Sequence, residues 1–78
     1  MELSPKLIGE TIKQLRNEKG LTQDVLSGLA GIARSHLAMI ENGSKKANLE
    51  TLCKIASALN MKPSELTKKI ECFTEDIS

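Results

Sequence analysis

The chain of 78 residues is 40% hydrophobic and 27% charged, with a formal net charge of +1. These values predict one domain spanning residues 1–78, with a small core, and by themselves they do not indicate nucleic-acid binding. No signal peptide and no apolar run of about 18 residues is found, which argues against a membrane span and favours the cytoplasm.

The first predicted helix covers residues 5–19. Its first position is a proline, which is well tolerated there, and Gly20 is suited to ending the helix. Ile8, Ile12 and Leu15 recur at the spacing of one helical face. We expect this face to point into the core.

Two short helices joined by a tight turn are predicted within residues 22–42. Thr22 is a favourable N-cap for the first of them, and Gly31 permits the left-handed turn that ends it. The second short helix is expected over about residues 33–42. Ala33 is a poor cap at its start, and Gly28 in the middle of the first helix should cost about 1 kcal/mol relative to alanine.

The second short helix has distinct inner and outer faces. Leu37 and Ile40 mark the inner face, whereas Ser35, Met39 and Asn42 point the opposite way. The flanking positions carry Arg34 and Ala38 on one side and His36 on the other.

A loop over residues 43–47 leads to two further helices. Asn48 is expected to cap the fourth helix, and the fifth begins at Pro63 and reaches at least Ile70. The expected inner face of the fourth helix consists of Leu49, Leu52, Ile55, Ala56 and Leu59. Because no segment shows strand-like alternation, the sequence predicts a five-helix, all-α domain.

The chain offers few side chains suited to catalysis or metal binding. It has one histidine, no tryptophan or tyrosine, and two cysteines, Cys53 and Cys72, which lie far apart. It also has no glycine-rich phosphate loop. We therefore expect no enzyme activity, metal site, cofactor or small-molecule substrate.

Three segments together resemble the helix-turn-helix proteins of the phage repressor and Cro type. LTQDVLSGLAGIARSHLAMIENG (21–43) resembles the motif itself, with the two helices at 22–42. IGETIKQLRNEKGLTQ (8–23) resembles the family's first helix, and NLETLCKIASALNMKPSEL (48–66) its fourth helix and the start of its fifth. The last segment is particularly similar to restriction–modification controller proteins. The C-terminal helix and tail would then occupy residues 63–78.

The resemblance implies a transcriptional regulator that binds double-stranded DNA in a sequence-specific manner. In such motifs the second helix enters the major groove, so Arg34, Ser35 and Met39 are the expected base-reading residues. The residues expected at the DNA backbone are Gln23, His36, Asn42, Ser44, Lys45 and Lys46. For His36, plain solvent exposure is an equal alternative.

An internal ion pair is expected between Arg16 and Glu41. Arg16 falls about 40° from Ile12 on its helix, and Glu41 falls about 40° from Leu37 on the later one, so both point toward the core. The resemblance implies the same contact, because family members join these two positions by a salt bridge. The alternative is that both side chains extend separately to solvent.

The family usually binds two half-sites as a symmetric homodimer on a palindromic operator, and autoregulation is a further expectation. A candidate dimer seam recurs along one helical face: Leu66, Ile70, Phe73 and Ile77. A frayed tail beyond Ile70 is the alternative, and Val25 and Leu29 form a competing apolar surface. Those two residues also support a different function, a protein-interaction module such as an antitoxin.

Overall fold

The computed structural model describes residues 4–77, and the side chains of residues 4–71. All regular secondary structure in this part of the chain is helical, which confirms the predicted all-α fold. The helices are α1 (Pro5–Glu18), α2 (Gln23–Ala30), α3 (Arg34–Glu41), α4 (Leu49–Ala58) and α5 (Pro63–Ile77). Within the described range, no helix combines the length and the apolar character that crossing a membrane requires.

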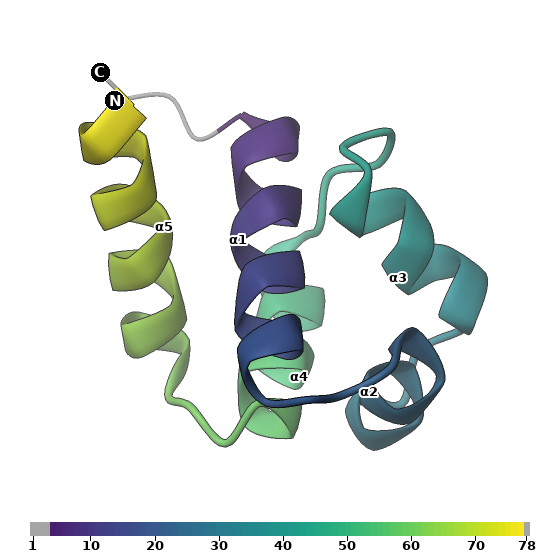
Figure 1. The fold of residues 1–78 in the computed structure, drawn as a ribbon. Helices are drawn as coiled ribbons and strands as arrows, with labels where there is room; N and C mark the ends of the chain where they lie inside the picture. Colours follow the sequence, from purple (N-terminus) through teal and green to yellow (C-terminus); the bar gives the residue numbers. More distant parts are fainter. Residues whose placement is uncertain (1–3, 78) are drawn as a thin grey trace.

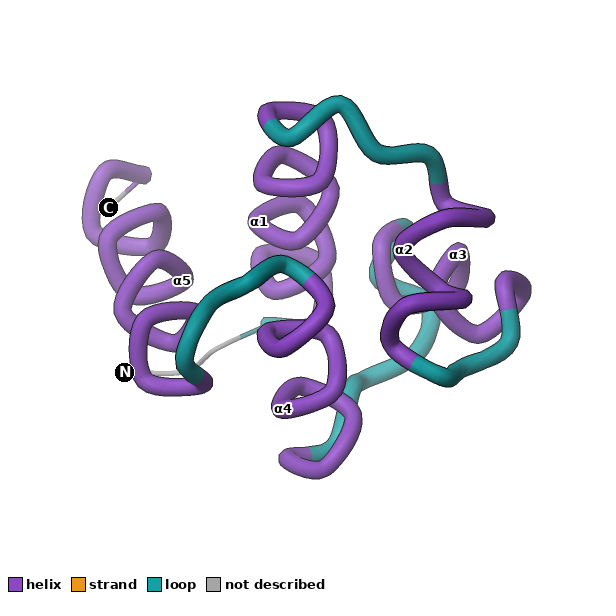
Figure 2. Tube along the Cα trace, turned by 90° about the horizontal axis from the view of Figure 1, so that it is seen from below, coloured by secondary structure: helices purple, strands orange, loops and turns teal. Residues whose placement is uncertain are grey.

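Helix α1 lies at the centre of the arrangement. It packs against α3 on one side and α5 on the other, while α4 contacts both α2 and α5. Figure 1 and the perpendicular view in Figure 2 both show α5 separated from the α2–α3 pair by α1. One side of the molecule is therefore formed by α2 and α3 alone.

Four of the helices are capped at their N-terminal ends by side chains that accept hydrogen bonds from backbone N–H groups. Ser4, Thr22 and Asn48 each accept from the N–H three residues later, at 2.8–3.1 Å. At the start of α5, the Glu65 carboxylate accepts from the backbone N–H of Lys62 at 2.9 Å. The start of α3 differs, because Ala33 has no side chain with which to cap it.

Each of the four connections between helices contains one residue in the left-handed region: Gly20, Gly31, Gly43 and Asn60. Gly31 ends α2 with φ of 72°, as the sequence predicts for the tight turn to α3. Asn60 takes φ of 62° after α4, a conformation that asparagine tolerates better than most residues. Both turns reverse the chain so that consecutive helices can pack on one another.

A single aliphatic core is shared by all five helices. Its buried hydrophobic members are Ile8, Ile12, Leu15, Leu26, Ala30, Leu37, Ile40, Ala47, Ile55, Ala56, Leu59, Leu66 and Ile70. Their burial, together with the partly buried Leu52, accounts for the inner faces predicted for the first, third and fourth helices, with one exception.

That exception is Leu49, which is 71% exposed instead of lying on the inner face of α4. It is the first residue of the helix and sits at the edge of the buried stripe, whereas Thr51 in the same turn is buried. Helical spacing assigned Leu49 to the core because periodicity does not show where the neighbouring helices stop covering a face.

The structure also narrows the expected dimer seam. Leu66 and Ile70 are fully buried in the chain's own core, between α5 and the rest of the bundle, and so are not accessible to a second chain. The side chains of Phe73 and Ile77 lie outside the described residues. A domain of this size has a small core and needs the large aliphatic side chains near its centre. Leu66 and Ile70, the first two residues of the expected seam, are therefore buried in that core.

Helix α1 approaches the backbone of α3 closely at Gly9. A Cβ built there would lie 2.1 Å from the carbonyl oxygen of Ile40 and 2.7 Å from that of Glu41. Any side chain at this position would force α1 away from the C-terminal end of α3. Gly28 is different, because a Cβ built on it meets no atom of the described residues within 4 Å.

We expect Gly9→Ala to lower the free energy of unfolding by about 1–3 kcal/mol, because the clash is with backbone that cannot rotate away. Gly28→Ala is the matched control and should raise the free energy of unfolding by up to about 1 kcal/mol through helix propensity. Urea denaturation measures both values. A Gly9→Ala variant as stable as the parent chain would contradict the close approach.

Candidate nucleic-acid interface

The α2–α3 pair forms a rigid unit anchored by its inner faces. Leu26 on α2 and Leu37 and Ile40 on α3 are fully buried. Ile32 in the connection packs partly against the same core. The outward surface of α3 is therefore held in a fixed orientation relative to the bundle.

The three residues expected to read bases lie on the exposed side of α3. Arg34 occupies the first position of the helix, and Ser35 and Met39 are likewise exposed. His36 is half-buried on the flank of the helix. The structure thus places a guanidinium, a hydroxyl and a thioether side chain together on one surface that no other helix covers.

Arg34 makes a contact that sequence reasoning missed. Its Nε lies 3.3 Å from Oδ1 of Asp24 on α2, with side-chain exposures of 66% and 73%. Asp24 is the second residue of its helix, and Arg34 is the first of the next. Because the two residues are ten positions apart and belong to different helices, only the angle between α2 and α3 brings them together.

The loop after α3 presents two cations from an ordered turn. The side-chain oxygen of Asn42 accepts from the backbone N–H of Ser44 at 2.9 Å and from the Ser44 hydroxyl. The N–H groups of Ser44 and Lys45 both donate to the carbonyl of Met39, at 3.0 and 3.2 Å. Lys45 and Lys46 are exposed beside this turn, next to the C-terminal end of α3.

Beneath this surface, Arg16 and Glu41 form the expected buried ion pair. Arg16 Nε donates to Glu41 Oε2 at 2.8 Å, and Arg16 Nη2 donates to Oε1 at 3.0 Å. The side chains are 10% and 2% exposed. This bidentate contact joins the last turn of α1 to the last turn of α3.

Two further groups complete the polar cluster. Arg16 Nη1 donates to the carbonyl of Leu21 at 2.8 Å, and the Gln23 amide nitrogen donates to Glu41 Oε1 at 3.1 Å. No buried side-chain nitrogen or oxygen among the described residues lacks a partner. Gln23, expected at the DNA backbone, therefore also ties the start of α2 to the end of α3. Sequence spacing carried no signal for this second role.

The pKa of the Arg16 guanidinium is raised above its ordinary value by its hydrogen bond to Glu41 and by the attraction of that carboxylate, although burial acts against this. The arginine is consequently charged at any pH at which the chain folds. A charged pair with all its hydrogen bonds satisfied is the condition under which burying two ions is tolerated.

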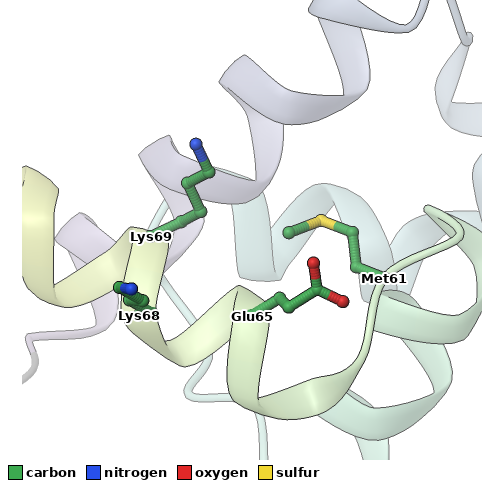
Figure 3. A pocket seen from close by; sticks show the side chains of 4 residues that line it. All are labelled: Met61, Glu65, Lys68 and Lys69. Atoms are coloured by element: carbon green, nitrogen blue, oxygen red, sulfur yellow. The ribbon is translucent and has the colours of Figure 1, made fainter.

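Away from this surface, the structure has a hollow of about 280 Å³ between the α4–α5 connection and α5. Figure 3 shows its lining residues Met61, Glu65, Lys68 and Lys69. The carboxylate of Glu65 already serves the start of α5. In the described part of the chain, no group of three or more His, Cys, Asp or Glu side chains is placed to hold a metal ion.

The arrangement of α2 and α3, with a buried inner face and an exposed outer one, agrees with the comparison to known proteins. Residues 12–66 match the family model described as helix-turn-helix. The chain belongs to the helix-turn-helix family. The matched range contains α2, α3 and α4 in full, the second half of α1 and the start of α5.

Among relatives of this helix-turn-helix chain is the immunity repressor protein of Bacillus phage phi105. The two are 39% identical over 69 residues, which cover 88% of this chain and 48% of the phage protein. The chain thus spans about half the length of that repressor, and its similarity confirms the expected likeness to phage repressors.

Two solved structures extend the comparison. The restriction–modification controller protein C.AhdI from Aeromonas hydrophila is 35% identical, with a TM-score of 0.76 over 80% of this chain and 94% of the controller. SinR, a master regulator for biofilm formation solved in complex with DNA, is 34% identical, with a TM-score of 0.71 over 77% of this chain and 97% of SinR.

A double-mutant cycle should reveal strong coupling between Arg16 and Glu41. Arg16→Met or Glu41→Leu alone leaves one buried charge unpaired and should lower the free energy of unfolding by about 3–5 kcal/mol. The double variant should recover much of that loss. Urea denaturation of the four chains measures the coupling.

The exposed pair of Glu50 and Lys54, at 3.7 Å, is the matched control. The corresponding cycle with Glu50→Leu and Lys54→Met should show coupling below about 1 kcal/mol. Equal coupling in the two cycles would mean that burial adds nothing to the Arg16–Glu41 contact.

Proposed function

We propose that the chain is a transcriptional regulator that binds double-stranded DNA in a sequence-specific manner, acting in the cytoplasm as a homodimer on a palindromic operator. The observation that carries the proposal is the exposed outer face of α3, oriented by the buried Arg16–Glu41 pair and led by Arg34. Similarity to SinR, which was solved with DNA, supports the same conclusion.

Base reading is assigned to the outer face of α3. The Arg34 guanidinium can donate two parallel hydrogen bonds to O6 and N7 of guanine in the major groove. Ser35 can donate or accept a hydrogen bond, and Met39 offers an apolar contact suited to a thymine methyl group. These three side chains are exposed in the free chain and need no rearrangement of the core to reach a base.

Backbone contacts are assigned to both ends of the α2–α3 unit. At one end, the free N–H groups in the first turn of α2, beside Gln23, suit a phosphate. At the other, Lys45 and Lys46 can neutralise phosphates, and Ser44 and the Asn42 amide can donate hydrogen bonds to them. His36 on the flank of α3 is assigned to the edge of the groove.

A homodimer would present two copies of α3 about 34 Å apart, one to each half of a palindrome. Because Leu66 and Ile70 belong to the core, the proposed seam is reduced to Phe73 and Ile77. If such a palindrome lies upstream of the gene for this chain, the dimer would bind there and regulate its own expression.

A second candidate function is favoured by one surface of α2. Val25 and Leu29 lie one turn apart and are 46% and 63% exposed. An apolar pair of this kind suits a partner protein. A chain that works only as such an adaptor would show no salt-dependent affinity for random duplex DNA.

The base-reading role predicts different behaviour for two cation variants. Arg34→Ala should lose about 1–3 kcal/mol of binding at the selected operator and relax the preference at one base position. Lys46→Ala should weaken binding to all duplexes alike and reduce the salt slope by about one. Fluorescence anisotropy with operator and scrambled duplexes at several salt concentrations measures both.

The operator for this experiment is selected from genomic fragments with the unmodified chain. If Arg34→Ala leaves the ratio of operator to scrambled affinity unchanged, Arg34 does not read a base. If the unmodified chain selects no fragment, sequence-specific binding itself is disproved.

The oligomeric state is predicted to depend on the C-terminal residues. Light scattering at micromolar concentration should give a dimer for the full chain and a monomer for Phe73→Ala, because the ring would be lost from a small seam. Leu29→Ala is the control and should remain dimeric. The reverse result would move the seam to α2, and a monomer even on the operator would end the dimer proposal.

A further inference from the structure

The contact between Asp24 and Arg34 joins the two helices at the surface assigned to DNA. Among the described residues, only Arg34 contacts the carboxylate of Asp24. The N-cap of α2 is Thr22, so Asp24 does not have that role. Exposed ion pairs of this kind add little to stability. An acidic residue in the first turn of α2 is favoured by the helix dipole, but that effect does not require the contact with Arg34.

The contact engages only one edge of the guanidinium. Arg34 Nε faces Asp24 Oδ1 at 3.3 Å, while Nη1 and Nη2 make no hydrogen bond to any described residue. A guanidinium is a planar fork whose remaining N–H groups point away from the occupied edge. A carboxylate at Nε therefore orients the fork and leaves two donors for a base.

The same carboxylate places a negative charge next to Gln23, at the end of α2 to which the proposed function assigns a DNA phosphate. Asp24 is in the first turn of α2, and its side chain is 73% exposed. It repels the backbone of every duplex equally, whatever the sequence. Only a duplex that presents a guanine to Arg34 gains a contact to offset that repulsion.

We propose that Asp24 is a specificity-determining residue, which positions the Arg34 fork and lowers affinity for DNA that lacks the correct base. This inference rests on the proposed function of sequence-specific DNA binding. A repulsive group beside an attractive one is a general way to obtain specificity, since discrimination is a difference between two affinities.

The test compares Asp24→Asn with the parent chain on the selected operator and on a scrambled duplex of equal composition. Asparagine keeps the shape of the side chain and removes its charge. Affinity for the scrambled duplex should rise about threefold to tenfold, and the ratio of operator to scrambled affinity should fall at least about threefold.

Two controls separate this role from net charge and from packing. Glu71→Gln removes the same charge at an exposed position on α5, far from the α2–α3 surface, and should change the ratio less than about twofold. Asp24→Glu keeps the charge and should retain most of the discrimination. Circular dichroism checks that each variant folds.

A third measurement links the two residues. In a chain that already carries Arg34→Ala, adding Asp24→Asn should still raise the scrambled affinity but should leave the ratio unchanged. An unchanged ratio for Asp24→Asn alone, or an equal effect of Glu71→Gln, would overturn the inference while the proposed function stands. A parent chain with no preference for any duplex would overturn both.

Discussion

The orientation of α3 depends on the buried contact between Arg16 and Glu41. It joins the last turn of α1 to the last turn of α3, whose backbone also lies close to Gly9 of α1. The Leu21 carbonyl and the Gln23 amide satisfy the remaining hydrogen-bonding groups. An ion pair of fixed bidentate geometry specifies an angle between helices, which aliphatic side chains alone define less sharply.

The second ion pair between helices lies in the opposite environment. Asp24 and Arg34 are both largely exposed, so water screens their attraction and the contact contributes little to the stability of the fold. The buried pair therefore fixes α3 relative to α1, whereas the exposed pair is accessible to a molecule that binds at α3. This difference follows from solvent access alone, because the residue types are nearly the same.

Local chemistry made much of the fold predictable. Caps such as Thr22 and Asn48, the turn at Gly31 and the aliphatic spacing of α1 each depend on a few neighbouring residues. The Arg16–Glu41 contact was predictable for a similar reason, since each charge lay on the inner face of its own helix. The resemblance of residues 21–43 to a known motif supplied the candidate DNA-facing side chains.

The sequence by itself thus determined the helices, their inner faces and the candidate surface on α3. Only the tertiary structure decided which side chains meet across helices: Asp24 with Arg34, Gln23 with Glu41, and Gly9 with the backbone of α3. It also decided that Leu49 is exposed and that Leu66 is taken by the core. Periodicity describes one helix at a time, whereas contact and burial depend on the angles and the ends of the helices packed around it.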